Sequence, residues 1–579
     1  MKIKLKNAGI CFIKTIKKHP FAIIMWFISL CLLTALIVNC INELIFRLSY
    51  ELKEIGNYDT YLYYTVGRAL SEGKQPYLEM YENKPPMIYL LSAISYKLFG
   101  NFYLTNICSF LSFLTMLIVP IVFCIVSWKN HKTNLILGVL TLIFTLATSL
   151  LFMFFSEEKS GEVQIEAFGT ACLLLSMLFC YLIDLKKPAK FYSVWVVLCG
   201  VFVGIATMFK EPFALVGAVV LLMFSHNKRD LLYRIIFPAV WALVTFVIIL
   251  LLSNCFVPYF TIYLKNMFSS HISIYGSPFE RFKNLKIIFD YLYNFLKIIP
   301  LLIVVFFITF AFKETLAHYS DNGIINVFCK FSGVIKAVLL LYTVSFVVGL
   351  GGQYYNHHHV FAMPFYFALL MIFAESLLSL KTERMAFKEI KQGFLTHKSE
   401  NKKTESELFS KKVLKNFFAY FALIVLIVVQ CDAFTKTEEY IDGTDWVIDM
   451  SHNTKINAKY IDDILDATGE KTYLWIGFNG YNPYAYTKHL PSGPCFAQDE
   501  NNFKDENNFF VTSFLSQLES VNIIVMKNNQ FELGVISDKV RDYVFENFCV
   551  QQPDCVINAE INKPETFSHI ILYRNNIFQ

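Results

Sequence analysis

Charged residues are scarce in this sequence. Asp, Glu, Lys and Arg make up 17% of the 579 residues and hydrophobic residues 55%, whereas a soluble domain has about a quarter charged. Apolar runs of about 18 to 25 residues recur along residues 1–434, and each is long enough to cross a hydrocarbon core of about 30 Å. The composition excludes an ordinary soluble protein and predicts an α-helical membrane protein with many spans.

Several chemical motifs are also missing. The sequence has no internal repeat and no glycine-rich loop of the kinds that hold nucleotide phosphates. None of its 14 cysteines has the spacing of a metal site. No motif requires a cofactor, although the use of a divalent metal is left open. The lipid bilayer is an expected partner and nucleic acid is not.

Lysines at the start of the chain set its orientation. The first twenty residues carry six Lys and no acid, and the apolar stretch 21–38 lacks the small-x-small pattern of a cleavage site. Positive charge flanking a span favours the cytoplasmic side. We therefore expect a retained first span with a cytoplasmic N-terminus in the cell membrane.

Segment 86–100 decides the rest of the topology. Its 15 residues include Lys97, so it is short for a crossing, and we predict a helix lying along the outer membrane surface. The later basic loops then all fall inside, including 381–415 with ten Lys and Arg against five acids. This bias of positive charge toward the cytoplasm supports the prediction.

The pattern predicts about eleven spans in a transmembrane domain, 1–434. Its outer loop 41–102 carries surface helices, a second outer loop covers 257–290, and 381–415 is a cytoplasmic linker. The predicted spans are 21–40, 103–127, 134–155, 163–184, 191–208, 211–225, 235–256, 291–312, 331–351, 357–379 and 416–434.

An odd number of spans places residues 435–579 outside the cytoplasm. Helical patterns at 455–467 and 538–547 alternate with apolar strand patterns at 472–476, 521–526 and 569–573. The alternation predicts a soluble extracytoplasmic α/β domain, a small three-layer sandwich.

Ionisable residues gather at the predicted outer rim. In a membrane protein such residues usually face water, pair with an opposite charge or take part in function. Asp59 lies in the run NYDTYLYYTVGRALSEG. It is either a carboxylate that takes a proton from a hydroxyl or the N-cap of a helix over 60–71 that ends near Gly73.

Two lysines are candidate phosphate ligands. Lys84 precedes a double proline that suits a helix start, where backbone N–H groups also attract phosphate. Otherwise Lys84 reaches to the interface and Glu82 is solvated. Lys210, in FKEP, either binds substrate or ends one span, and Glu166 either acts in the site or belongs to a solvated acidic turn.

The histidine run NHHH, residues 356–359, opens a predicted late span. His357 and His358 are candidate substrate-binding residues, and a polar helix entry is the plainer interpretation. No fixed partner is evident for a metal site there.

The order of these features resembles that of the GT-C membrane glycosyltransferases, in the superfamily of protein O-mannosyltransferases and lipid A aminoarabinose transferases. The resemblance covers residues 20–380, and a strand ending Trp-x-Gly in an outer C-terminal domain is also usual. The matching features are Asp59, Tyr63, Gly73, Pro76-Tyr77, Lys84-Pro85-Pro86, Phe99-Gly100, Glu166, Lys210-Glu211-Pro212, His357–Phe361 with Pro364, and Trp475 with Gly477.

The chain departs from the family pattern at several points. Asp59 follows Tyr58 where many relatives have paired acids, and the second acid is Glu166 rather than Asp. Glu211 stands where the family turn has Gly, and no Tyr follows the last His of the late entry.

The resemblance implies an inverting transfer of sugar from a polyprenyl phosphate to a hydroxyl of a lipid, glycan or protein of the cell envelope. Asp59 is then the general base, and Lys84 and Lys210 stabilise the leaving phosphate. Glu166 orients Lys84 or the acceptor, and Tyr63, Glu82, His357 and His358 bind substrate.

The alternative is a transporter or flippase of lipid-linked saccharides. Such proteins share the span number and the charges at the rim. They usually have two similar halves and polar breaks near the middle of the membrane, and the sequence shows neither.

Overall fold

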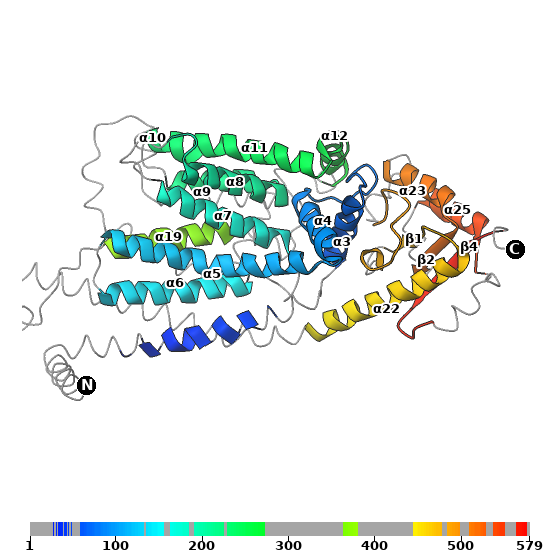
Figure 1. Ribbon diagram of the computed structural model, residues 1–579, viewed down its shortest axis with the longest axis horizontal. Coiled ribbons are helices and arrows are strands. Elements are labelled where there is room, and N and C mark those ends of the chain that lie inside the picture. The colour runs from blue at the N-terminus through cyan, green and yellow to red at the C-terminus, as the bar shows by residue number, and fades with distance from the viewer. Residues whose placement is uncertain are drawn as a thin grey trace, which may run out of the picture.

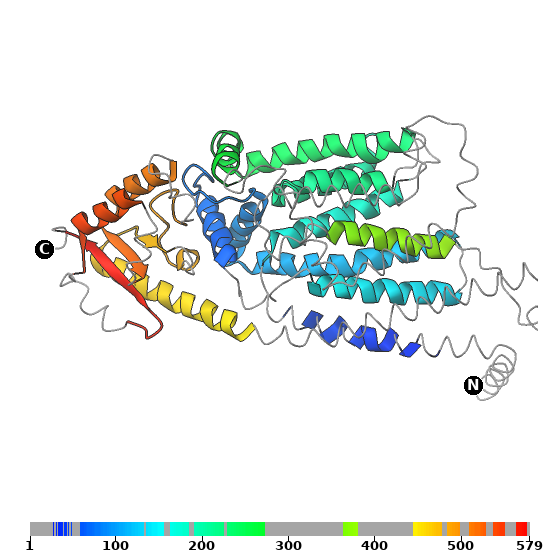
Figure 2. The ribbon, with the colours of Figure 1, turned by 180° about the vertical axis from the view of Figure 1, so that it is seen from behind.

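The computed structural model describes residues 58–131, 135–155, 163–183, 190–224, 228–271, 363–379, 444–477, 483–497, 509–527, 537–550 and 563–575, with scattered positions between 27 and 48. A helical bundle occupies one end, two shorter helices cross its tip, and a small sheet with helices lies beyond them (Figures 1 and 2).

Long apolar helices build the bundle. Three in the described residues are long and apolar enough to cross a membrane: Tyr103–His131, Ile165–Leu182 and Arg229–Leu252. The bundle helices are α5 (Tyr103–His131), α6 (Leu135–Phe155), α7 (Ile165–Leu182), α8 (Val194–Phe209), α9 (Phe213–Met223), α11 (Phe237–Leu252) and α19 (Met363–Ser379).

These helices lie within the predicted spans or a few residues beyond them. α11 is preceded by α10 (Lys228–Leu231) and a π-helical turn, η1 (Leu232–Ile236), so the helix starts earlier than predicted. Short α- and π-helical turns over 256–271 follow it: α12 (Phe256–Pro258), η2 (Tyr259–Tyr263), α13 (Leu264–Asn266) and η3 (Met267–His271). The predicted spans 291–312, 331–351 and 416–434 and the linker 381–415 lie outside the described residues, so the total of eleven spans stays a prediction.

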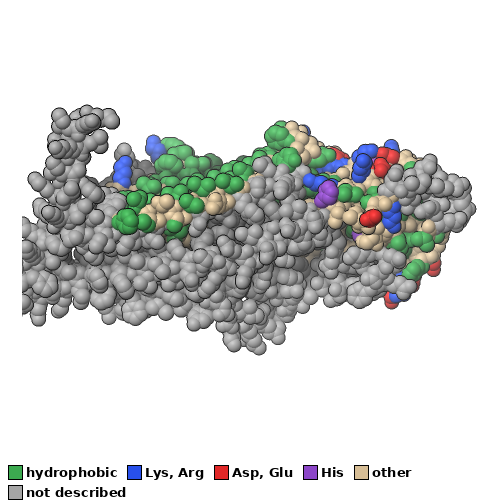
Figure 3. Space-filling model, turned by 90° about the horizontal axis from the view of Figure 1, so that it is seen from below, with side chains coloured by type: hydrophobic (Ala, Val, Ile, Leu, Met, Phe, Trp, Pro, Cys, Tyr) green, Lys and Arg blue, Asp and Glu red, His purple; other side chains and the backbone are tan. Residues whose placement is uncertain are grey.

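Small residues bring two of these helices together. A Cβ added to Gly200 would lie 2.3 Å from the Pro238 carbonyl oxygen, and one on Gly204 would lie 2.7 Å from that of Ala242. This small-xxx-small spacing lets α8 pack closely on α11. The outer face of α11 stays apolar, with Leu243 63% exposed. Hydrophobic side chains cover the visible part of the described bundle in Figure 3, as expected of a lipid-facing surface.

Two helices, α3 and α4, lie across one end of the bundle (Figure 1). α3 (Tyr58–Ser71) begins one residue before Asp59, which therefore lies in its first turn rather than at the predicted N-cap. Gly73 follows α3 with φ +93°, in the left-handed conformation of a helix end. α4 (Met87–Phe99) begins after Pro86 as predicted. That α4 lies on the membrane surface stays a prediction.

The C-terminal residues form a mixed four-stranded sheet in the order β1-β2-β4-β3. β1 (Leu474–Ile476) pairs in parallel with β2 (Ile523–Lys527), whereas β4 (His569–Arg574) is antiparallel to β2 and to β3 (Phe548–Cys549). α22 (Thr444–Thr468) appears on one side of the strands in Figures 1 and 2, and α23 (Phe509–Ser520) and α25 (Asp538–Asn547) on the other. The sequence did not predict α23 or β3, and α22 begins earlier than predicted.

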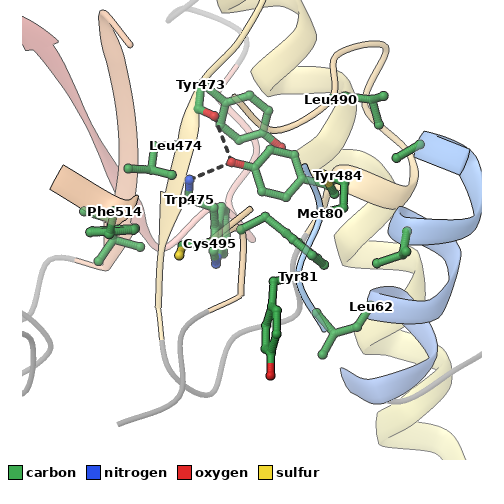
Figure 4. Packing of buried hydrophobic residues seen from close by; sticks show 14 of the residues in the cluster. Leu62, Met80, Tyr81, Tyr473, Leu474, Trp475, Tyr484, Leu490, Cys495 and Phe514 are labelled. Atoms are coloured by element: carbon green, nitrogen blue, oxygen red, sulfur yellow. Dashed lines mark hydrogen bonds between the residues drawn. The ribbon is translucent and has the colours of Figure 1, made fainter. Parts of the chain in front are cut away.

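The C-terminal sheet and the segment that carries α3 and α4 share one hydrophobic core. Leu62 of α3 and Met80 belong to the same buried cluster as Trp475 and Phe514 of the C-terminal segment (Figure 4). Tyr484 joins the cluster, since its hydroxyl donates to the Tyr473 carbonyl over 2.8 Å and accepts from the Trp475 amide over 2.9 Å. A boundary at residue 435 therefore does not separate two independent cores.

Arg68 of α3 is the polar centre of this contact and is only 4% exposed. Its guanidinium donates to the carbonyls of Tyr484, Thr487 and Lys488 on the segment after β1, and Nε donates to Glu72 over 2.9 Å. A planar guanidinium with five donors suits such a convergence of acceptors. Arg68 thus fixes α3 to the C-terminal segment.

Further contacts surround this arginine. The Tyr61 hydroxyl donates to Ser451 Oγ over 2.7 Å, and the Tyr81 amide donates to the Pro494 carbonyl over 3.0 Å. The Tyr81 ring lies edge-on to Phe510, with 4.8 Å between centroids. The C-terminal segment therefore holds both α3 and the loop that leads to α4.

Labelling of single cysteines by an impermeant maleimide should test the predicted topology. In a background without native cysteines, K563C should react in intact cells, because residues 435–579 are expected outside. K402C should react only after lysis, because the basic segment 381–415 is expected inside. Labelling at K402C but not at K563C in intact cells would show that the membrane topology is the opposite of the predicted one.

Candidate functional site

Four segments bring the candidate residues to the end of the bundle that meets α3 and α4. Asp59 lies in the first turn of α3, and Tyr63 follows one turn later. Burial raises the pKa of the Tyr63 phenol well above its usual value, and the nearby charges of Asp59, Glu166 and Glu82 raise it further. Tyr63 therefore stays protonated amid three carboxylates that come from different parts of the sequence.

Glu166 and Lys210 form one ion pair of the site. Glu166 is the second residue of α7 and is only 2% exposed, and Lys210 directly follows α8. The Lys210 ammonium donates to Glu166 Oε1. A cation at a helix C-terminus interacts favourably with the helix dipole, so the end of α8 stabilises the Lys210 ammonium in addition to Glu166. The resemblance had suggested that Glu166 orients Lys84 or the acceptor. The structure pairs it with Lys210, and a role toward the acceptor stays a prediction.

Lys84 and Glu82 form a second, looser pair in the turn before α4. Lys84 Nζ lies 3.9 Å from Glu82 Oε1 and donates to Asn83 Oδ1 over 2.9 Å. Glu82 is 7% exposed, so it is not the solvated side chain of the alternative interpretation. A phosphate at this place would compete with the carboxylates of Glu82 and Glu166 for the two lysines.

A group of tyrosines holds the Lys84 turn, and sequence reasoning missed it. Tyr77 has a left-handed backbone with φ +68°, which is uncommon for a bulky residue. Its hydroxyl donates to the Lys84 carbonyl over 2.8 Å, and its ring lies 4.8 Å from that of Tyr263. The Tyr263 hydroxyl in turn donates to Glu211 Oε1 over 2.6 Å.

Glu211 joins these tyrosines to the Lys210 turn. It also accepts from the Tyr259 hydroxyl over 3.1 Å. The Glu211 carboxylate, which stands where the family has glycine, thus accepts hydrogen bonds from two tyrosines of η2. Through Tyr263 and Tyr77 it connects the turn that holds Lys210 to the turn that holds Lys84. This network could have been suspected from the sequence, because Glu211 replaces the family glycine and tyrosines occur at 259 and 263.

Two candidates and the metal question remain. His357 and His358 lie outside the described residues. Within the described ranges, no group of three or more His, Cys, Asp or Glu side chains converges closely enough to hold a metal ion.

Part of this arrangement lies in a segment that matches a known protein family. Residues 83–254 match the family model described as dolichyl-phosphate-mannose-protein mannosyltransferase, a range that includes Lys84, Glu166 and Lys210. No curated protein matches the chain by sequence.

The fold is similar to that of two solved structures of one protein. The structure of ArnT from Cupriavidus metallidurans bound to undecaprenyl phosphate matches with a TM-score of 0.50 and 13% identity, over 93% of this chain and 98% of the other. The apo state of the same protein matches with a TM-score of 0.52 and 14% identity, with the same coverage.

The family match and the shared fold confirm the resemblance seen in the sequence. Residues 83–254 match the mannosyltransferase family, and the chain has a fold similar to that of ArnT, the GT-C fold; both comparisons support a membrane glycosyltransferase. The transporter alternative is not supported.

Proposed function

We propose that the protein transfers a sugar from a polyprenyl phosphate to a hydroxyl of a cell-envelope acceptor at the outer face of the membrane, with inversion at the anomeric carbon. The observation that carries this proposal is the convergence of Asp59 with two lysine–carboxylate pairs at one end of the bundle. The undecaprenyl phosphate bound to the structurally similar ArnT supports a donor of this class.

The reaction needs one base and one site for a leaving anion. The acceptor oxygen attacks the anomeric carbon, its proton passes to the Asp59 carboxylate, and the bond from that carbon to the phosphate oxygen breaks. The bonding electrons leave with the polyprenyl phosphate, and the proton on Asp59 is then lost to water. A positioned general base contributes typically 10² to 10⁴ in rate.

The lysines supply the anion site. Lys84 and Lys210 stabilise the negative charge that grows on the phosphate as the bond breaks, and such preorganised charges act most strongly where water is excluded. Glu166 and Glu82 hold the two ammonium groups in place before the donor arrives. Tyr63, which lies close enough to Glu166 and Glu82 to feel their charge, supplies a neutral hydrogen-bond donor. His357 and His358 remain proposed contacts to the substrate.

Lys84→Ala tests the anion site. Loss of an ammonium that contacts the phosphate should raise the KM for the donor roughly tenfold or more, because hydrogen bonds to charged groups are the stronger ones. Transfer from undecaprenyl-phosphate sugars is measured with purified protein, and NMR of the product gives its anomeric configuration. Retention of configuration would contradict the proposed mechanism.

Two further lysine variants complete the experiment. Lys84→Arg keeps the charge and should recover part of the lost donor affinity. Lys97→Ala removes an exposed lysine from the last turn of α4, the helix that follows Lys84, and should leave the KM unchanged. An equal loss in all three variants would point to general damage to α4 rather than to a phosphate ligand.

A further inference from the structure

Tyr89 is a buried tyrosine in the first turn of α4 whose role the proposed reaction leaves open. The side chain is fully buried, and its hydroxyl completes no hydrogen bond with any group in the described part of the chain. Its ring is enclosed by aromatic neighbours, with centroids 6.4 Å from Tyr63 and 6.3 Å from Tyr77. The apolar part of the side chain is therefore well packed, and the polar atom is the exception.

The hydroxyl lies close enough to residues of the candidate site to feel their charge. Burial raises the pKa of Tyr89, and the charges of Glu82 and Asp59 raise it further, so the group is a neutral O–H. The Lys84 backbone amide approaches closely enough to lower that pKa in part. An amide N–H can only donate, so among the described residues the proton of Tyr89 has no acceptor.

An unused donor in this position is unfavourable for the free protein. Burying a hydroxyl without an acceptor costs free energy, and a Phe of the same shape would avoid that cost. The cost disappears if a ligand supplies the missing acceptor. The ligand oxygen would have to lie beside the Lys84 turn, at the N-terminal end of a 13-residue helix whose backbone N–H groups also favour an anion.

We infer that the Tyr89 hydroxyl binds the donor by donating a hydrogen bond to an oxygen of its phosphate, next to the ammonium of Lys84. This inference rests on the proposed function, because it takes a polyprenyl phosphate as the ligand. Phosphate fits better than a sugar hydroxyl, because Lys84 and the start of α4 both favour negative charge at this place. Tyr89 would thus hold the phosphate both before and after the sugar leaves.

Tyr89→Phe removes the hydroxyl and keeps the ring. The probe is undecaprenyl phosphate in detergent micelles, which carries the phosphate without any sugar. We expect the variant to melt at the same temperature as the wild type or higher, because it loses only an unpaired polar atom. Its dissociation constant for undecaprenyl phosphate should rise roughly tenfold, as for the loss of a hydrogen bond to a charged group.

Tyr484→Phe is the matched control. Its hydroxyl is also buried but is bonded on both sides within the C-terminal segment. That variant should melt at a lower temperature and bind undecaprenyl phosphate as the wild type does. The two tyrosines should therefore give opposite results from the same chemical change.

Each other outcome has a definite meaning. Unchanged affinity in Tyr89→Phe would overturn the inference, and so would a lower melting temperature or failure to fold, because the hydroxyl would then have a partner within the protein. Normal affinity for undecaprenyl phosphate with weaker binding of the sugar-bearing donor would assign the hydroxyl to the sugar instead. A wild-type protein that does not bind undecaprenyl phosphate at all would refute the proposed function itself.

Discussion

Asp59→Asn should give a folded membrane protein that transfers sugar at least about 10² times more slowly than the wild type. Asn has nearly the same shape and can still accept a hydrogen bond at the start of α3, so the helix should form normally. An amide cannot take up the proton of the acceptor hydroxyl. The rate of transfer should therefore fall while the melting temperature and the binding of undecaprenyl phosphate stay close to those of the wild type.

Asp466→Asn is the control for this experiment. Asp466 lies on α22 with its side chain 53% exposed, and it pairs with Lys488 away from the lysines of the site. Its replacement should leave the rate unchanged. If Asp59→Asn retained full transfer activity, Asp59 would not be the base, and Glu166 would become the next candidate.

Arg68→Ala should destabilise the contact between α3 and the C-terminal segment by roughly 3 kcal/mol or more, since each buried carbonyl left without a donor costs about 1–3 kcal/mol. Three carbonyls of the segment 484–488 lose their donor together. The expected results are a lower melting temperature and faster proteolysis of the C-terminal segment. Transfer should also fall, because α3 carries Asp59 and Tyr63.

Arg541→Ala separates this effect from the general loss of an arginine. Arg541 lies on α25 and pairs with Asp538 and Asp542 at the surface. Exposed pairs contribute about 0–1 kcal/mol, so that variant should melt near the wild-type temperature. Equal melting temperatures for Arg68→Ala and the wild type would show that Arg68 does not hold the contact.

The sequence predicts local structure well in this chain because the local signals are strong. Pro86 marks the start of α4, Gly73 has the backbone of a helix end, and the apolar runs match α5, α6 and α7 within a few residues. The helix α23 was not predicted, although its buried residues Phe510, Phe514 and Leu518 recur at the spacing of one helix face. Its aromatic and β-branched residues are also common in strands.

Pairings across the chain were beyond the reach of sequence patterns. Glu166 and Lys210 were both candidates, but 44 positions separate them and nothing local assigns one to the other. Arg68 was overlooked because a single arginine in a helix usually reaches water, and its acceptors are backbone carbonyls more than 400 positions away. Every residue has a backbone carbonyl, so the sequence does not show which carbonyls accept a hydrogen bond. Only the packed structure reveals such a contact.

The distance along the chain between α3 and its carbonyl acceptors has a consequence for biosynthesis. A ribosome that adds about 5–20 residues per second needs roughly 20 to 80 s after making Arg68 to reach Lys488. During that interval the nascent chain can insert its first spans, but the helix that bears Asp59 has no C-terminal segment to pack against. Such non-local contacts form late in folding. Catalytic competence should therefore appear only after the last fifth of the polypeptide has been made, and prematurely terminated chains should accumulate in the membrane without activity.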